Sequence, residues 1–289
     1  MPGTTPRTGP VRLAFWYGKG GVGKSTTTIL LALSLARHGD QVLVIDLDPE
    51  CGTSRDFVGK KLLGVQDNLK SFLESDLLTP PPIIATGIEG LAVTPCPPDE
   101  QRFFRYFPEH SSKLADSLSL IGPDLDYILM DVPNQFDNIV ELGLIAAEHV
   151  VLPVELTADC VERLPTVLRI ITEAKAVNPN LKILGALALA ATPSNGHKQP
   201  LSAKERLIYD EYDAAFQKHG IKFFKTLMYR SATTVEEARS SADLRYLHWT
   251  ARRRFNSLLN EIKLRITSPL SYGTVRNPQS RSKATEAVA

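Results

Sequence analysis

Residues 17–27 of this chain read YGKGGVGKSTT, a glycine-rich turn between an apolar run and a segment of helical periodicity. Gly18 to Ser25 match G-x-x-x-x-G-K-[ST], the pattern of a phosphate-binding loop. Such a loop requires a strand before it and a helix after it, because backbone N–H groups and the helix N-terminus together hold the phosphate oxygens. The pattern therefore predicts an α/β fold with a nucleotide site at the end of its first strand.

The rest of the chain alternates short apolar runs with longer segments of helical period. The expected strands are 11–17, 41–46, 90–95, 127–131, 149–154, 182–190 and 221–228. The expected helices are 24–38, 59–77, 109–121, 137–148, 159–177, 201–219 and 246–266. This alternation predicts a single P-loop domain over residues 11–266, with a mostly parallel twisted sheet and helices on both faces. The polar ends, 1–10 and 267–289, are predicted to be disordered tails.

The glycine loop supplies most of the expected nucleotide contacts. Lys24 places its charge on the β- and γ-phosphates, and the Ser25 hydroxyl is a ligand for Mg²⁺. Glycine permits the phosphates to approach the backbone closely, since a side chain would block them. The predicted nucleotide-binding residues are Gly20, Gly21, Val22, Gly23, Lys24, Ser25 and Thr26.

Three carboxylates are expected beside this loop. The apolar run VLVID ends at Asp46 and is followed by Asp48, and the run YILMD ends at Asp131. The carboxyl ends of parallel strands face the ligand crevice, so these acids are expected near the phosphates. A carboxylate after an apolar strand holds Mg²⁺ in P-loop enzymes, and a carboxylate near the γ-phosphate can orient the attacking water. The alternative for Asp46 and Asp48 is a simple turn at the end of a strand.

The segments KGGVGKSTT, DLDPE, GIEGLAVTPCPPD (87–99), DVPNQF (131–136) and VVLPVEL (150–156) resemble the ParA branch of the ParA/MinD partitioning ATPases, from about Val11 to Glu261. The resemblance implies ATP and Mg²⁺ as cofactors and an ATP-dependent homodimer. It implies that Lys19 reaches the phosphates of the partner subunit, that Asp48 positions the water, and that Asp46 and Asp131 serve the metal. Lys19, Lys24 and Asp48 would then be the catalytic residues.

The same resemblance implies a cellular role. A ParA-type ATPase binds nonspecific DNA, hydrolyses ATP slowly to ADP and phosphate, and is stimulated by a ParB-like or other cargo adaptor. The cycle positions a plasmid, a chromosome or another cargo. The chain departs from the family at Asn134, where a second proline is usual, and its segments 187–200 and 228–246 match the family loosely. DNA-contacting residues therefore do not transfer from the family.

Cysteine placement bears on a different class of protein. The opening YGKGGVGKSTTT also resembles the nitrogenase iron protein, whose dimer shares an iron–sulfur cluster held by two cysteines of each subunit. Cys51, Cys96 and Cys160 do not match those positions, which argues against a reductase. The three isolated cysteines indicate a reducing compartment, and the chain shows neither a signal peptide nor an apolar run of membrane-spanning length. We therefore expect a cytoplasmic protein, and the resemblance to ParA implies association with the nucleoid.

Basic residues gather near the C-terminus although the formal net charge is only +1. Residues 250–266 have a helical apolar stripe made of Phe255, Leu258, Leu259, Ile262 and Ile266. The basic residues expected mostly off this stripe, on the outer side, are Arg252, Arg253, Arg254, Lys263 and Arg265. Three interpretations remain: the basic side binds DNA phosphates, the helix is a core element without a ligand, or it lies on a membrane as in the MinD branch. A polar tail and a stripe without Trp weaken the membrane interpretation. The candidate DNA-binding residues are Arg239, Arg245, Arg252, Arg253 and Arg254.

Overall fold

The computed structural model describes residues 9–59, 66–96, 112–134, 138–190, 201–229 and 249–267. Its strands are β1 (Val11–Phe15), β2 (Val42–Asp46), β3 (Ile84–Ala85), β4 (Leu91–Thr94), β5 (Tyr127–Asp131), β6 (His149–Glu155), β7 (Lys182–Ala190) and β8 (Met228–Tyr229). Its helices are α1 (Lys24–Arg37), α2 (Gly52–Val58), α3 (Leu69–Glu74), α4 (Lys113–Leu118), α5 (Asn138–Ala146), α6 (Ala158–Val177), α7 (Ala203–Gln217) and α9 (Trp249–Thr267).

The strands form one sheet in the order β3-β4-β2-β5-β1-β6-β7-β8. All neighbours pair in parallel except β3, which runs antiparallel to β4 at the edge. Because the central strands are parallel, their carboxyl ends meet at one edge of the sheet. This confirms the predicted α/β fold with a mostly parallel sheet.

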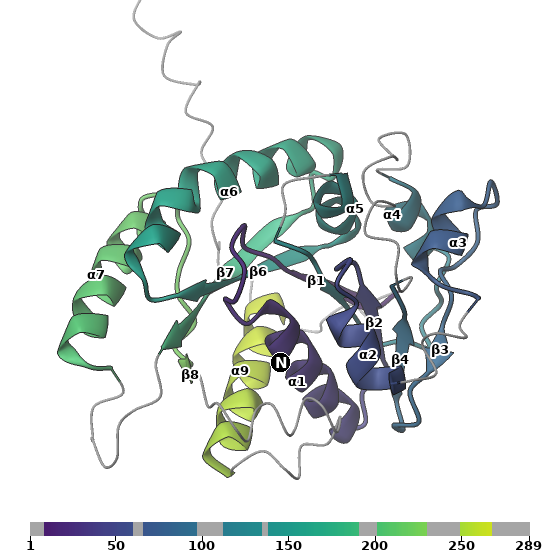
Figure 1. The fold of residues 1–289 in the computed structure, drawn as a ribbon, viewed down its shortest axis with the longest axis horizontal. Helices are drawn as coiled ribbons and strands as arrows, with labels where there is room; N and C mark the ends of the chain where they lie inside the picture. The colour runs from purple at the N-terminus through teal and green to yellow at the C-terminus, as the bar shows by residue number, and fades with distance from the viewer. Residues whose placement is uncertain are drawn as a thin grey trace, which may run out of the picture.

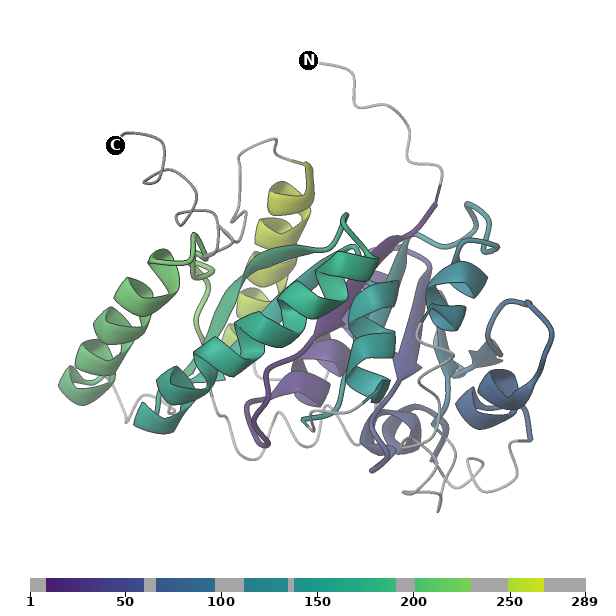
Figure 2. The same ribbon diagram turned by 90° about the horizontal axis from the view of Figure 1, so that it is seen from above.

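Helices cover both faces of the sheet (Figures 1 and 2). Strand β1 shows why two layers form, since its side chains alternate between two buried clusters. Leu13 and Phe15 belong to the cluster beneath α1 and α9, while Ala14 belongs to the cluster beneath α5 and α6. A strand with both faces covered is expected to be mostly apolar, and in VRLAF only the half-buried Arg12 departs from that pattern.

The structure differs from the sequence prediction in its short elements. Strand β3 and helix α2 were not predicted, and the helix expected over 59–77 is reduced to α3 within the described residues. Asn68 begins α3, because its side chain accepts from the N–H groups of Lys70 and Ser71 in a capping box. The predicted tails lie almost wholly outside the described residues, so their disorder remains a prediction.

The strand expected over 221–228 is also shorter than predicted. Only an isolated bridge from Phe223 to Ala186 and the two residues of β8 pair with β7. The N–H groups of Lys225 and Thr226 instead donate to the carboxylate of Glu261 on α9, at 2.9 and 3.1 Å. The backbone that would form a ladder is thus bound to a helix. In the described part of the chain, no helix is both long and apolar enough to cross a bilayer.

Candidate nucleotide and magnesium site

The glycine loop joins β1 to α1 and adopts the backbone conformation that its glycines allow. Gly21 has φ of 75°, and Gly23, the N-cap of α1, has φ of 79°. Both values are left-handed, a region that side chains with a Cβ rarely occupy. A Cβ at Gly20 would lie 2.7 Å from the side-chain nitrogen of Asn134, which follows β5. The loop is therefore a close-packed turn in front of a helix N-terminus, as phosphate binding requires.

Lys24 is the first residue of α1 and is only 7% exposed. Its Nζ donates to the main-chain oxygen of Lys19 at 3.3 Å. Burial lowers the pKa of Lys24, and Asp131 and Asp48 act in the opposite direction. A cation held by a carbonyl in a buried position is well placed to receive an anion such as phosphate.

Asp46 and Asp131 lie side by side because β2 and β5 pair with these two residues in register. Both are fully buried. The N–H and hydroxyl of Ser54 donate to Oδ2 of Asp46 at 2.7 and 2.6 Å, and the N–H of Asp48 donates to Oδ1 at 3.1 Å. The Thr53 hydroxyl donates to Oδ2 of Asp131 at 2.7 Å. The start of α2 thus fixes both carboxylates.

Asp131 fits a metal ligand better than Asp46 does. Its Oδ1 is buried and has no hydrogen-bond partner among the described residues, whereas both oxygens of Asp46 accept from protein donors. The side chain of Ser25 is close enough to lower the pKa of Asp131. An open carboxylate oxygen next to a hydroxyl suits Mg²⁺, which takes oxygen ligands. In the described ranges, no three His, Cys, Asp or Glu residues gather to hold a metal, so phosphate and water would supply its other ligands.

Burial also explains the electrostatics of this pair. It raises the pKa of Asp46 to about 8 and that of Asp131 to about 6. For Asp46 the nearby charge of Asp131 adds to the effect, while the nearby hydroxyls of Thr53 and Ser25 oppose it at Asp131. Two adjacent buried carboxylates favour a bound cation, because the cation removes the cost of ionising them.

Asp48 lies further from the sheet and is half-buried. Its Oδ1 accepts the N–H of Glu50 at 3.0 Å, which holds the side chain within the turn after β2. Cys51 ends this turn with φ of 51°, the one left-handed residue other than glycine in the described part of the chain. The turn interpretation and the water-positioning interpretation are both compatible with this geometry.

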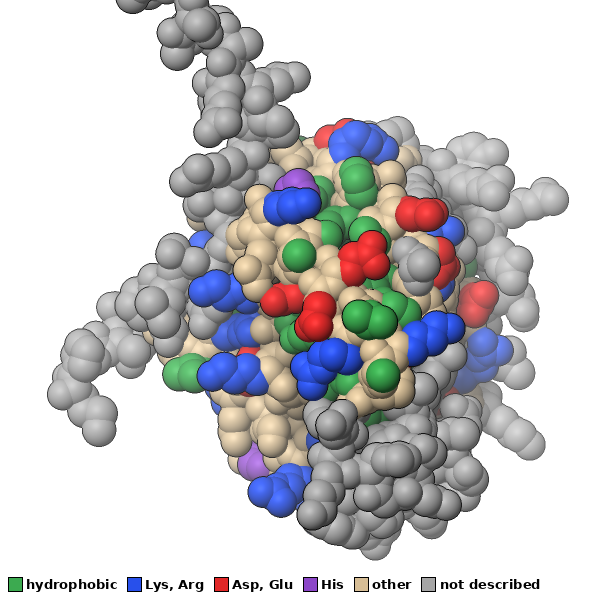
Figure 3. Space-filling view, turned by 90° about the vertical axis from the view of Figure 1, so that its left-hand side faces the viewer, with side chains coloured by type: hydrophobic (Ala, Val, Ile, Leu, Met, Phe, Trp, Pro, Cys, Tyr) green, Lys and Arg blue, Asp and Glu red, His purple; other side chains and the backbone are tan. Residues whose placement is uncertain are grey.

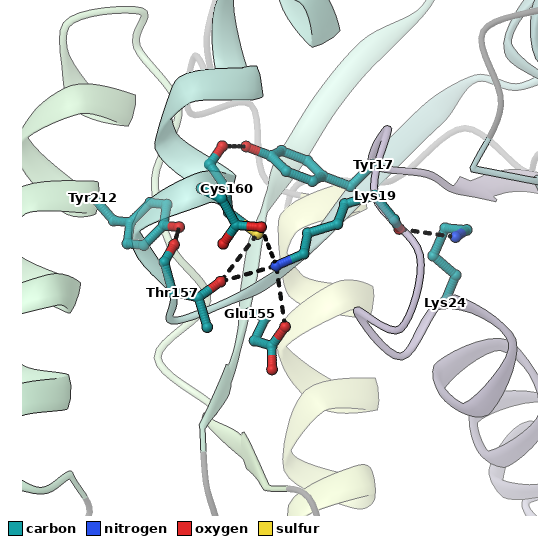
Figure 4. A network of polar contacts seen from close by, with 8 residues as sticks. Tyr17, Lys19, Lys24, Glu155, Thr157, Cys160 and Tyr212 are labelled. Carbon is teal, nitrogen blue, oxygen red and sulfur yellow. Dashed lines mark hydrogen bonds and ion pairs between the residues drawn. The ribbon is translucent and has the colours of Figure 1, made fainter.

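Lys19 points away from Lys24 toward the end of β6 (Figure 4). Its Nζ lies 2.7 Å from Oδ2 of Asp159, 3.3 Å from Oε2 of Glu155 and 3.0 Å from Oγ1 of Thr157. These residues meet because β6 pairs with β1, so the chain after β6 emerges beside the glycine loop. None of these three residues was predicted as part of the site, although polar residues directly after the apolar run VVLPV were a usable signal.

Helix α9 confirms its predicted apolar stripe but not the position of one arginine. Phe255, Leu258 and Ile262 are buried, as expected. Arg265 was expected on the outer basic side, which is wrong: it is 7% exposed, and its guanidinium donates to the main-chain oxygens of Leu184, Lys222 and Phe223. The aliphatic stem of arginine can follow the stripe inward while its head reaches buried carbonyls.

The remaining basic residues of α9 have mixed surroundings. Arg253 is exposed, and Arg252 is partly exposed. The Arg254 guanidinium carbon lies 3.8 Å from the centre of the Tyr229 ring, a cation–π contact. Arg239 and Arg245 lie outside the described residues. Arg252, Arg253 and Arg254 are thus consecutive at the start of α9, and their role in DNA binding remains a prediction.

The fold and the glycine loop define a P-loop ATPase, and comparison with known proteins agrees. A family model described as AAA domain matches residues 12–183. The chain is 30% identical over 227 residues to the chromosome-partitioning ATPase Soj of Thermus thermophilus. The aligned region covers 78% of this chain and 83% of that protein. The chain belongs to this AAA-domain family of ParA/Soj partitioning ATPases.

Two solved structures share the fold at lower identity. A McdA–ATP complex from Cyanothece superposes with a TM-score of 0.73 and 16% identity, covering 89% of this chain and 98% of that one. Cobyrinic acid a,c-diamide synthase from Mycobacterium smegmatis, bound to ADP and magnesium, superposes with a TM-score of 0.69 and 20% identity. The match covers 93% of this chain and 100% of that one. Proteins of this fold therefore bind adenine nucleotides and magnesium, and they include enzymes of unrelated activity.

Proposed function

We propose that this ATPase alternates between a monomer and an ATP-bound homodimer that binds DNA without sequence preference. A ParB-like or other cargo adaptor stimulates an otherwise slow hydrolysis, and the cycle positions a plasmid, chromosome or other cargo. The observation that carries the proposal is the second lysine of the glycine loop, Lys19, whose ammonium lies outside the cradle that Lys24 serves. The role named for the Thermus thermophilus relative, chromosome partitioning, supports it.

The two lysines divide the work by position. Two ammonium groups in one phosphate cradle repel each other, so a second lysine gains little in its own subunit. Presented by a partner to a triphosphate, an ammonium is attracted by roughly 4 kcal/mol for each unit charge at 4 Å and surface-like dielectric. This contact needs the γ-phosphate, which makes the dimer conditional on ATP.

The other residues bind and orient the reactants. The main-chain N–H groups of Gly20 to Thr26 hold the phosphates, with Lys24 at the β- and γ-positions. Ser25 and Asp131 would hold Mg²⁺, and Asp46 would support it from the adjacent strand. The bound Mg²⁺ neutralises charge that develops on the phosphate oxygens. Asp48, outside this buried pair, orients the attacking water.

DNA binding is assigned to the arginines at the start of α9. The apolar stripe of this helix is buried against the sheet, so it is not available to a bilayer while α9 is docked, which favours DNA over the membrane interpretation. On the face over α7, by contrast, the described Lys and Arg side chains are interspersed with Asp, Glu and apolar groups (Figure 3). Arg252, Arg253 and Arg254 offer a denser positive charge for phosphates.

Separate alanine variants of the two lysines test the proposal. Lys24→Ala removes the charge within the cradle, so we expect nucleotide affinity to fall sharply. Lys19→Ala leaves the cradle intact, so ATP affinity should stay near wild type while the dimer is lost. Losing one charge-assisted contact in each of two symmetric sites should weaken dimerisation by roughly 10²–10⁴-fold.

The measurements are ATP affinity with a fluorescent nucleotide and dimerisation by analytical ultracentrifugation with ATP and Mg²⁺. Lys204→Ala, at an exposed position on α7, is the control for a simple loss of lysine. If Lys19→Ala still dimerises with ATP, or cannot bind ATP at all, the trans role of Lys19 is wrong.

A further inference from the structure

Lys19 has well-defined partners within its own subunit. Glu155, Thr157 and Asp159, here called the Lys19 cradle, place three oxygens within 3.3 Å of its Nζ. The Lys19 side chain is 18% exposed and that of Glu155 is 19% exposed, while Asp159 is 56% exposed. A loop lysine with no task would be expected in water, because confining a long side chain costs entropy. The cradle therefore confines this ammonium at a defined place.

The Thr157 side chain binds Lys19 instead of capping helix α6. Thr157 is the N-cap residue of α6, yet its side chain makes no capping hydrogen bond to that helix. Its hydroxyl is directed to Lys19 and to the Cys160 sulfur instead. An N-cap threonine ordinarily stabilises its helix by such a bond. The Tyr212 hydroxyl also donates to the main-chain oxygen of Thr157, which fixes the cradle from α7.

The two residues before Lys19 are bound to the same helix, and Figure 4 shows the contact of Tyr17 with Cys160. The Tyr17 hydroxyl donates to the main-chain oxygen of Cys160 at 2.5 Å. The Arg163 guanidinium donates to the main-chain oxygen of Gly18 at 2.7 Å. Residues 17–19 and the first turns of α6 thus form one connected unit. Movement of Lys19 is coupled to the start of α6.

We propose that the Lys19 cradle is a latch: Glu155, Thr157 and Asp159 hold Lys19 within the monomer, and Lys19 must leave them to reach the phosphates of a partner subunit. Asp159 and Glu155 are then positioning residues that set how much ATP-dependent dimer forms. This inference rests on the proposed trans role of Lys19.

The latch is weak enough to open. Surface ion pairs shift an equilibrium by only about 1.4- to 5-fold, and the 56% exposure of Asp159 places its pair with Lys19 at the surface. The triphosphate of a partner subunit presents more negative charge than the Lys19 cradle, so the triphosphate can outcompete the cradle for the Lys19 ammonium. Asp159 lies in the first turn of α6, where the helix dipole favours a carboxylate even after the lysine has left. The latch therefore opens without leaving an unstable charge behind.

Lys19 and Asp159 both stay charged at neutral pH. Partial burial alone lowers the pKa of Lys19, but its bonds to Asp159 and Glu155 outweigh burial and raise the pKa above the ordinary value. The bond from Lys19 lowers the pKa of Asp159 to about 2. Two other cations bind main-chain oxygens of this loop: Lys24 donates to that of Lys19, and Arg163 donates to that of Gly18. Both latch partners stay charged, and ATP rather than pH is the signal that opens it.

Asp159→Asn, which keeps the shape and removes the charge, is the principal test. Dimerisation releases two latches, so the dissociation constant of the dimer with a non-hydrolysable ATP analogue and Mg²⁺ should fall by about 2- to 30-fold. Adding Glu155→Gln should lower it further, with nucleotide affinity unchanged. Glu173→Gln is the matched control, because it removes one charge from the same helix and breaks the exposed Arg169–Glu173 pair.

Acylation of Lys19 gives a second readout that does not depend on the dimer. With limiting acetic anhydride, mass spectrometry on the nucleotide-free protein should show Lys19 reacting severalfold faster in Asp159→Asn than in wild type, with exposed Lys204 as the internal reference. Equal reactivity in the two proteins would overturn the latch.

The outcomes separate the two proposals. If wild type forms an ATP-dependent dimer but Asp159→Asn dimerises like Glu173→Gln, or more weakly, the latch is wrong and the proposed function stands. A gain that persists in a Lys19→Ala background would also overturn the latch, since the effect would not pass through Lys19. If wild type forms no ATP-dependent dimer, the proposed function fails, and the latch has no role in dimerisation.

Discussion

The buried carboxylates Asp46 and Asp131 have opposite effects on stability and on metal binding. Their pKa values in the folded protein, about 8 and about 6, lie above the value near 3.9 of an unfolded chain. Between about pH 4 and pH 8 the folded state therefore binds more protons than the unfolded state. The free energy of unfolding falls as pH rises through that window. Metal-free protein thus gives up stability to keep a site that attracts Mg²⁺.

Asp131→Asn should separate these two effects. We expect the nucleotide-free variant to be more stable than wild type by about 1–2 kcal/mol at pH 8 and to lose part of the stability decline between pH 5 and pH 8. Mg²⁺ with ADP should raise the melting temperature of wild type but raise that of the variant much less, because the amide lacks the negative charge of the carboxylate ligand. Thermal unfolding at several pH values, with and without Mg²⁺·ADP, measures both. A variant that Mg²⁺·ADP stabilises as much as wild type would contradict the assignment of Asp131.

Among the elements, α9 is held to the sheet by a buried ionic network as well as by its apolar stripe. Arg265 pairs with Glu261 at 2.9 Å and lies over the Phe224 ring, 3.9 Å from its centre. Gly185 on β7 leaves room for this guanidinium, since a Cβ there would collide with it. Glu261 in turn binds the backbone after the Phe223 bridge. One arginine and one glutamate thus join α9, β7 and the segment before β8.

Arg265→Leu should show how much this network contributes. Three main-chain oxygens would lose their donor and Glu261 would be left partly buried without its cation, so we expect the free energy of unfolding to fall by about 3–5 kcal/mol. Lys263→Met is the control, because it breaks the more exposed ion pair with Asp40 and should cost under about 1 kcal/mol. Urea denaturation compares them. Equal losses in the two variants would mean that Arg265 contributes no more than a surface pair.

For the whole molecule, assembly determines how many phosphates it can contact. If each subunit offers about three contacts through the start of α9, a dimer offers about six, and raising salt from 50 to 200 mM should weaken DNA binding by roughly 10³-fold. Binding should require ATP, because a monomer alone has too few contacts. Fluorescence anisotropy with DNA duplexes of unrelated sequence measures both effects.

The triple variant Arg252→Glu, Arg253→Glu and Arg254→Glu should lose affinity for all duplexes alike and show a shallower salt dependence. The control is a second triple variant with the same change in net charge at other places: Lys175→Glu on α6, Lys204→Glu on α7 and Lys218→Glu directly after α7. This control should bind DNA more nearly like wild type. If the triple variant is unstable, the double variant Arg252→Glu with Arg253→Glu can replace it, because it retains the contact of Arg254 with Tyr229. Unchanged DNA affinity in a folded variant would remove α9 from the interface.

The sequence by itself determined the features that depend on neighbouring residues. A strand, a glycine turn and a helix are consecutive in the chain, so the phosphate loop with Lys24 and Ser25 was predictable, as was the placement of Asp46 and Asp131 at the ends of buried strands. The burial of Phe255, Leu258 and Ile262 follows from helical spacing alone. These are short-range patterns, and periodicity encodes them directly.

Only the tertiary structure decided which distant residues meet. The order β2-β5-β1-β6 puts Asp46 against Asp131 and the end of β6 beside Lys19, and nothing in the local sequence specifies that order. The same holds for Thr53, Ser54 and the Lys19 cradle, whose roles come from partners far along the chain. Arg265 shows most clearly what the sequence does not determine. Its charge led to the prediction that it is exposed, but hydrogen bonds to three carbonyl oxygens and an ion pair with Glu261 stabilise its guanidinium in the interior.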